Sequence, residues 1–359
     1  MTSRRSTGAG ILVALLSAAT FATSGPFAKS LLDTGWTPGS VVFLRIAGAA
    51  LLLLVPTLWA LGGRWHLLRR GWGQVVAYGL AAVAVPQLAF FYAVQHLSVG
   101  VALLLEYLGL VLVVAWQCLV ARRLPRRPTV VGIVLAVVGL VLVLDLFGGV
   151  SISGIGVMWG LIAACGLASY FLLSGHAAEQ PLPPLVLAGG GLVVGATAFA
   201  VLGVTGVLPM SFGTQPVQLA GVSFPWWAAV LELAVVAAAT AYVAGIIAAR
   251  VLGAKLASFV GLSEVMFAVL LAWVLLGELP RPVQLLGGLF ILAGVVAVRA
   301  EESPGPASSG GEPGVTVGPA PVGNGPEVAD DRVDLGRLDV VAAQHHGRAV
   351  GPVEQHGPV

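Results

Sequence analysis

The sequence predicts an all-α polytopic membrane protein with about ten transmembrane helices, arranged as two inverted five-helix repeats. Three observations support this prediction. Of the 359 residues, 58% are hydrophobic and only 9% are charged, whereas soluble domains carry roughly 25% charged residues. The mean hydropathy is +0.97, and the apolar residues form runs long enough to span a bilayer. The chain also resembles itself at an offset of 155 residues, as the matched positions below show.

The apolar runs are separated by short segments rich in Pro, Gly and Arg, which are typical of connections. The first run follows Arg4 and Arg5, as in a signal peptide. It continues to about Leu32, however, so we interpret it as a retained transmembrane helix. The predicted spans cover residues 9–31, 39–61, 73–94, 97–121, 129–147, 155–175, 184–208, 225–249, 255–277 and 283–300.

These spans divide the chain into four parts. Residues 1–8 form the N-terminus, 9–147 the first five-helix repeat and 155–300 the second. The remaining residues, 301–359, are rich in Gly, Pro, Ser and charge and have no apolar periodicity. We therefore expect a disordered tail. Its scattered histidines are not expected to bind a metal.

The basic residues fall mainly in alternate connections. If the N-terminus is cytoplasmic, most arginines lie in inside segments, and Arg281 is the exception in an outside loop. Because cytoplasmic loops carry an excess of Lys and Arg, this bias predicts that both termini are cytoplasmic. The expected location is the cell (inner or plasma) membrane. The net charge of +2 is too small to indicate nucleic-acid binding.

The internal repeat depends on matches that apolar composition alone does not explain. At the offset of 155 residues, Leu124-Pro125-Arg126 matches Leu279-Pro280-Arg281. Two glycine pairs match as well, Gly132 with Gly287 and Gly139 with Gly294. Five spans per repeat is an odd number, so the second copy must enter the membrane inverted. Inverted repeats are typical of secondary transporters, whose substrate site lies at the repeat interface near the bilayer midplane.

Several short motifs point to a known family. They are Pro38 with Phe43-Leu44-Arg45, Phe91-Tyr92, Leu105-Glu106-Tyr107-Leu108-Gly109, Ser263-Glu264-Val265 and Leu276-Gly277-Glu278. With them, residues 8–300 resemble the EamA-type branch of the drug/metabolite transporter superfamily. This resemblance implies ten helices, two five-helix repeats and transport without ATP. The run from Leu105 to Gly109 is similar to that of family members that export amino acids.

Ionisable residues within the spans are the first candidates for a site, because a charge in the hydrocarbon region is costly. They are Arg45, Glu106, Glu232 and Glu264. At about 1.5 Å per helical residue, Glu106 and Glu264 each lie roughly 12 Å from a membrane surface, near the midplane. We expect Arg45 to pair with Glu106 or Glu232 in at least one conformation. The pair is either a permanent tie between helices or a group that binds substrate or opens during transport.

Glu264 has no evident partner in its half of the membrane. A carboxyl group buried alone is easily protonated, as a proton-coupled carrier requires. The alternative is a neutral glutamic acid that is hydrogen-bonded to the backbone of a neighbouring helix. Uncharged residues near the midplane complete the candidate set: Gln87, Tyr92 and Tyr107, with Trp159, Tyr170, Tyr242 and Trp273 as weaker candidates.

The sequence also lacks the motifs of other function classes. It contains no Walker-type loop, no His-Glu-x-x-His metal motif and no Gly-x-Ser-x-Gly nucleophile motif, so we expect neither an enzyme nor a cofactor or metal site. Cys118 and Cys165 lie in apolar segments without the charged surroundings that activate a thiolate, and we interpret them as structural.

The predicted function is secondary transport of small polar metabolites such as amino acids, most simply export by alternating access. The expected partners are the small-molecule substrate and the lipid bilayer, with protons as a candidate coupling ion. The alternatives are efflux of drugs or toxic metabolites and, from another class, a non-transporting membrane scaffold or sensor that uses the tail as its output. The oligomeric state stays open.

Overall fold

The computed structural model describes residues 2–120, 127–144, 153–177 and 182–301. Apart from Glu301, the predicted tail lies outside the described residues. The elements are α1 (Thr2–Ala22), α2 (Ser24–Leu32), α3 (Pro38–Leu61), α4 (Trp65–Arg70), α5 (Trp72–Ala77), η1 (Tyr78–Ala84), α6 (Val85–His96), α7 (Val99–Val120), α8 (Arg127–Val143), α9 (Gly154–Ala177), α10 (Pro184–Val204), β1 (Val217–Leu219), β2 (Val222–Phe224), α11 (Trp226–Ala234), η2 (Val235–Thr240), α12 (Ala241–Gly261), α13 (Ser263–Leu276) and α14 (Pro282–Glu301).

Within the described residues, seven helices are long and apolar enough to cross a membrane by length and composition. Three further apolar helices are shorter, at 10–17 residues. Each of them overlaps a predicted span, although several limits differ, and the count of ten transmembrane helices stays a prediction. The seven are Gly8–Leu32, Pro38–Leu61, Trp72–His96, Val99–Trp116, Gly154–Leu173, Pro184–Val204 and Trp226–Leu252, and the three are Thr129–Val143, Ser263–Leu276 and Pro282–Ala297.

Large apolar side chains cover the outside of the helical bundle. Leu51, Trp59 and Met266, for example, are 70% exposed or more. Such a surface would aggregate in water, whereas lipid solvates it. The inside of the bundle is apolar as well, and Ile46 and Phe91 are completely buried. The chain is therefore a multi-pass membrane protein.

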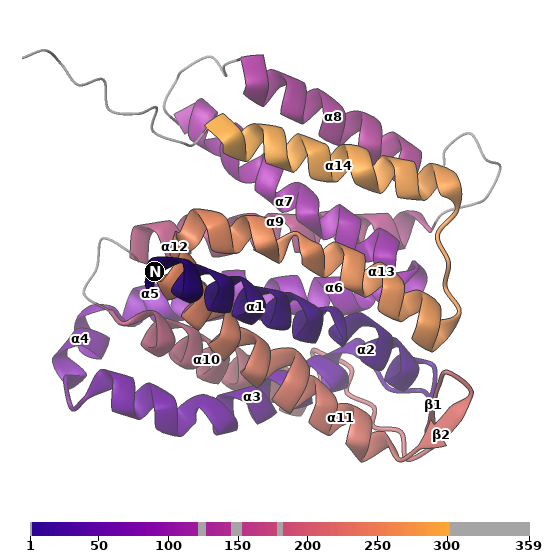
Figure 1. The fold of residues 1–359 in the computed structure, drawn as a ribbon. Coiled ribbons are helices and arrows are strands. Elements are labelled where there is room, and N and C mark those ends of the chain that lie inside the picture. Colours follow the sequence, from indigo (N-terminus) through magenta and orange to yellow (C-terminus); the bar gives the residue numbers. More distant parts are fainter. Residues whose placement is uncertain (1, 121–126, 145–152, 178–181, 302–359) are drawn as a thin grey trace, which may run out of the picture. The chain divides into compact units, whose positions relative to one another are not determined.

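The long helices run between two ends of the bundle (Figure 1). We call the end with the β1–β2 hairpin the hairpin end, and the opposite end, where α1 begins, the N-terminal end. Prolines and glycines set many helix limits. Pro38 and Pro184 start α3 and α10, where the missing N–H costs no helical bond. Gly62 and Gly277 follow α3 and α13 with positive φ angles of 56° and 71°, which glycine adopts without strain.

The first span is interrupted at Thr23, between α1 and α2. Pro26 has no N–H to donate to the carbonyl group of Ala22, so the regular helical bonding cannot continue there. The Thr23 hydroxyl lies 2.7 Å from the Thr20 carbonyl oxygen and also contacts the Glu232 carboxyl group, so its one proton is shared between two possible acceptors. The interruption lies beside the cavity that is described below.

Two other spans contain a π-helical segment. The span Trp72–His96 contains η1, which ends just before Pro86, and the span Trp226–Leu252 contains η2. Single π-helical turns inside α-helices occur frequently at functional sites, because they shift the register of side chains and backbone carbonyl groups. Gly166 of α9 packs against Pro86, since a Cβ atom at Gly166 would lie 2.6 Å from the Pro86 Cβ atom.

Helices α8 and α14 pack side by side through glycines (Figure 1). A Cβ atom at Gly139 would lie 2.6 Å from the Gly287 carbonyl oxygen, and one at Gly294 would lie 2.5 Å from the Gly132 carbonyl oxygen. Small residues at both crossing points therefore allow the two backbones to touch, as is common between membrane helices.

The fold is all-α apart from one short hairpin, and one helix continues past its predicted end. The connection between α10 and α11 contains a two-stranded antiparallel hairpin, β1–β2. The Ala220 N–H of this hairpin donates to the Leu275 carbonyl oxygen at 2.7 Å, which fixes it to the end of α13. A connection was also expected after residue 249, yet α12 continues to Gly261, because a charged residue such as Arg250 does not by itself end a helix.

A candidate substrate cavity

A cavity of about 730 Å³ lies inside the bundle. Its walls come from α1, α2, α3, η1, α6, α7, α9, α10, α12 and α13. At the N-terminal end, the lining extends to Leu182, Pro184 and Arg250. Most of the wall is apolar, so the few charged and polar groups within it dominate its chemistry.

Arg45 lines this cavity and is only 5% exposed. Its Nη2 atom donates to the carbonyl oxygen of Ala237 in η2 at 3.1 Å. The guanidinium carbon lies 5.6 Å from the centroid of the Phe91 ring, which is within range of a cation–π contact. The Nε atom is buried without a hydrogen-bond partner among the described residues. Arg45 therefore has a free donor beside the cavity.

No carboxyl group of the described residues lies within ion-pair distance of Arg45 in this conformation. The sequence predicted a pair with Glu106 or Glu232. The π-helical segment offers the Ala237 carbonyl oxygen instead, and this acceptor takes the place expected for a carboxylate. The expectation of an Arg45–glutamate pair in another conformation stays a prediction.

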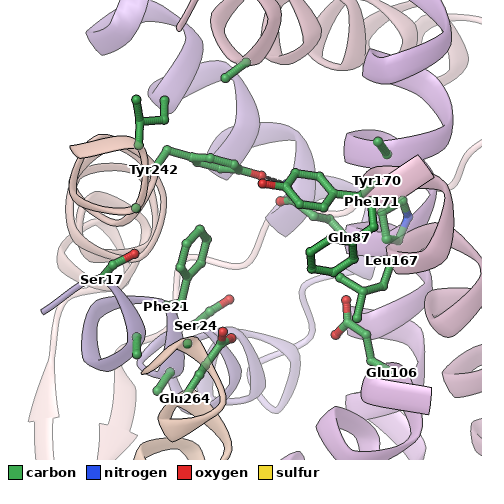
Figure 2. Close-up of a pocket in the computed structure, with 18 of the residues that line it drawn as sticks. Ser17, Phe21, Ser24, Gln87, Glu106, Leu167, Tyr170, Phe171, Tyr242 and Glu264 are labelled. Atoms are coloured by element: carbon green, nitrogen blue, oxygen red, sulfur yellow. Dashed lines mark hydrogen bonds between the residues drawn. The ribbon is translucent and has the colours of Figure 1, made fainter. Parts of the chain in front are cut away.

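Glu106 and Glu264 enter the cavity from opposite sides (Figure 2). The expectation that Glu264 has no partner is wrong. The Tyr107 hydroxyl donates to the Glu264 Oε2 atom at 3.0 Å and lies 3.3 Å from the Gly261 carbonyl oxygen. The sequence did not reveal this contact, because Tyr107 and Glu264 are 157 residues apart and meet only where α7 and α13 pack.

Aromatic side chains line the space between these charges. Tyr242 and Tyr170 point toward one another across the cavity (Figure 2). Gln87 Nε2 donates to the Tyr242 hydroxyl at 3.4 Å, which links α6 to α12. Phe21 packs edge-on against Tyr242, with 5.2 Å between the ring centroids. Aromatic rings of this kind bind flat or apolar parts of a ligand, while the carboxyl groups and Arg45 bind its charged parts.

The sequence as a whole matches a family model twice. Residues 8–145 and 154–300 each match the EamA-like transporter family, and both halves contribute to the cavity walls. The chain belongs to the EamA-like transporter family. Members of this family are transporters of the drug/metabolite type, as the resemblance implied.

A solved structure shares the fold of this EamA-like protein. A crystal structure titled only "Crystal structure of protein" aligns with a TM-score of 0.52 and 19% sequence identity. The alignment covers 82% of this chain and 99% of the other. At this identity the comparison supports the fold alone. No curated protein matches the chain.

Five of the seven residues predicted for the site line the cavity of the EamA-like chain: Arg45, Gln87, Glu106, Tyr107 and Glu264. The other two do not belong to its lining. Tyr92 stacks on Trp159, with 4.6 Å between the ring centroids. Glu232 accepts a hydrogen bond from the Thr23 hydroxyl at the interruption between α1 and α2. Its Oε2 atom is buried without a partner among the described residues.

The contribution of the first span to the cavity was not predicted from the sequence. Ser17, Phe21 and Ser24 line the cavity at helical spacing along one face of α1 and α2. Ser17 also donates to the Ala241 carbonyl oxygen at 2.8 Å, at the start of α12. The available signal was the series of small and polar residues every three or four positions in an otherwise apolar span.

Proposed function

We propose that this EamA-like protein is a secondary transporter that exports small polar metabolites across the cell membrane by alternating access. The observation that carries the proposal is the cavity between the two matched halves, where Arg45, Glu106 and Glu264 lie within an apolar wall. Charged groups inside the membrane are energetically costly, and those that occur there commonly line a substrate or ion pathway. A pathway for a polar cargo therefore accounts for these three residues.

The lining favours a cargo that carries charge and also has an apolar part. Arg45 suits a carboxylate, because its Nε donor is unpartnered. Glu106 and Glu264 suit an ammonium group. An amino acid with an apolar side chain provides all three features. The aromatic lining around Tyr170 and Tyr242 also favours the second candidate function, which is efflux of amphipathic drugs or toxic metabolites.

Alternating access by two inverted repeats is supported by equivalent positions in the two halves. A shift of η1 by the repeat offset of 155 residues gives 233–239, which overlaps η2 at Val235–Thr240. The same shift converts Gln87 into Tyr242, and these two side chains are hydrogen-bonded to each other. If a two-fold axis relates the two repeats, a residue can contact its own equivalent only close to that axis. The axis proposed here would pass between α6 and α12.

The orientation that we propose places both termini in the cytoplasm. The cavity lining extends toward the N-terminal end, which would then be the cytoplasmic side. A cavity on that side receives cargo from the cytoplasm, as an exporter requires. The positive-inside bias of the connections supports this orientation.

We further propose that Glu264 couples transport to protons, and this part can be tested separately from the choice of cargo. We expect uptake of a labelled amino acid into proteoliposomes to follow an imposed pH gradient in the wild type. We expect Glu264→Gln to lose this dependence and still exchange cargo down its own gradient, because glutamine keeps the shape of the side chain and cannot release a proton. The measurement is flux with a panel of labelled amino acids, with and without the gradient.

Two controls define the outcome. Tyr107→Phe removes the hydrogen bond to Glu264 and keeps the ring, so gradient dependence should change without a complete loss of flux. Asp33→Asn neutralises an exposed carboxyl group outside the cavity and should behave as wild type. Gradient-driven flux that is unchanged in Glu264→Gln would remove Glu264 from the coupling mechanism. Absence of flux for every amino acid, with flux of a labelled organic cation, would favour drug efflux.

A further inference from the structure

An ion pair lies at the hairpin end of the bundle, beside the end of α13 to which the hairpin is hydrogen-bonded. Lys29 of α2 pairs with Glu278, which follows the glycine that ends α13. Both side chains are 20% exposed. Solvent and salt therefore weaken the pair less than they weaken a fully exposed pair. The pair joins two segments that are separated by 249 residues.

The same two side chains also bind the connection between α6 and α7. Lys29 Nζ donates to the Leu97 carbonyl oxygen at 3.3 Å, and the Val99 N–H donates to the Glu278 Oε2 atom at 3.0 Å. Leu97 adopts an extended conformation and ends α6, so these backbone groups have no helical partners. The Glu278 carboxylate also faces the N-terminus of α7, where a negative charge is favourable. The ion pair thus ties together α2, the α6–α7 connection and the end of α13.

These three segments also pack against one another near the pair. A Cβ atom at Gly25 of α2 would lie 2.2 Å from the Val99 Cγ1 atom, so the Val99 side chain of α7 packs directly on the α2 backbone there. One at Gly100 would lie 3.1 Å from the Val269 Cγ2 atom of α13. Gly25 and Val99 also line the cavity. These close contacts beside the cavity therefore belong to the segments that the ion pair holds.

We propose that the Lys29–Glu278 pair is a lock that keeps the hairpin end of the cavity closed and must open before cargo can pass that end. The lock favours conformations that are accessible from the N-terminal end. The first repeat does not provide a second copy of this carboxylate, because Arg123 stands 155 residues before Glu278. The proposal rests on the proposed transport function for the statement that a cargo passes this end. Closure of the cavity at this end can be tested without a cargo.

The experiment measures access to the cavity from the hairpin side. In the full-length chain, Cys118 and Cys165 are replaced by serine, and Ser24→Cys provides a reporter in the cavity wall. A membrane-impermeant maleimide is added to intact cells and to inside-out vesicles. A separate Ser223→Cys variant identifies which preparation exposes the hairpin. We expect Lys29→Gln and Glu278→Gln each to increase the labelling rate from the hairpin side about tenfold, which corresponds to about 1.4 kcal/mol.

Two variants make the result specific to the ion pair. Lys29→Arg keeps the positive charge and the donors, so its labelling rate should stay within about twofold of the parent. Asp33→Asn is the matched control at the same end of α2. Asp33 follows Lys29 by four residues at the end of α2, and partial burial raises the pKa of its carboxyl group, an effect that Lys29 opposes and Glu278 reinforces. Its neutralisation should leave the labelling unchanged.

The lock is refuted if neither Lys29→Gln nor Glu278→Gln labels faster, or if Asp33→Asn increases the rate equally. If one of these two variants does not elute as a single species in gel filtration, the test relies on the variant of the other residue of the pair. Faster labelling of the two glutamine variants without any flux would support the lock and count against the transport function. Flux with unchanged labelling would support the transport function and refute the lock.

Discussion

Replacement of Arg45 with leucine is expected to reduce flux by about 100-fold, equivalent to about 2.7 kcal/mol. Arg45 is buried in the cavity wall, and its Nε atom is a free donor for an anionic group of the cargo. Loss of one partner of a buried charged contact commonly costs about 2–5 kcal/mol, which includes the expected value. Leucine also removes the hydrogen bond to the Ala237 carbonyl oxygen in η2.

The protein should nevertheless fold with leucine at this position. Leucine removes the desolvation cost of the guanidinium group and leaves no unpaired carboxylate, because no carboxyl group of the described residues pairs with Arg45 in this conformation. The comparison therefore includes the thermal midpoint of each purified variant beside its flux. Arg45→Lys keeps the charge but not the planar fork, and we expect an intermediate flux.

Arg69→Gln is the matched control, since Arg69 is exposed at the end of α4 and does not line the cavity. Its flux should equal that of the wild type. Wild-type flux in a folded Arg45→Leu protein would show that Arg45 only supports the helices. A fall in flux together with a large fall in the thermal midpoint would lead to the same conclusion, because the loss would follow from instability.

The sequence predicted helix positions well where proline and glycine mark them. Pro38, Pro184 and Gly277 lie at helix limits because their backbone preferences are local and do not depend on the rest of the fold. The π-helical segments η1 and η2 were not predicted. A π-helical turn leaves the apolar character of a span unchanged, so apolar periodicity does not reveal where such a turn lies.

The candidate site was predicted in part, by a physical criterion that does not require the fold. Arg45, Glu106 and Glu264 were chosen because a charge inside the membrane is costly, and all three line the cavity. Glu232 met the same criterion but lies outside the lining, since depth along a helix does not indicate which face turns inward. The Tyr107–Glu264 contact depends on packing between distant spans. Local sequence predicts neither the direction of the Glu232 side chain nor this contact.

A leucine at Gly139 is expected to cause a large loss of stability, because Gly139 lies in the close contact between α8 and α14. A Cβ atom there would lie 2.6 Å from the Gly287 carbonyl oxygen and 2.8 Å from the Ile291 backbone nitrogen. Both are backbone atoms, so a side-chain rotation cannot relieve the clash. Overpacking of a close-packed interface costs about 1–3 kcal/mol and sometimes more. We therefore expect the thermal midpoint of the purified protein to fall by roughly 5–10 °C.

Gly73→Leu is the control, because Gly73 lies in α5 and a Cβ atom there would have nothing within 4 Å, so the same substitution meets open space. Its thermal midpoint should stay the same or rise slightly, since leucine favours a helix over glycine. Gly287→Leu should resemble Gly139→Leu, because a Cβ atom at Gly287 would lie 2.7 Å from the Gly139 carbonyl oxygen. Equal midpoints for the Gly139 and Gly73 variants would contradict close backbone packing between α8 and α14. A loss confined to the two interface glycines would show that this contact, which joins the last helix of each matched half, is a principal source of the cohesion between them.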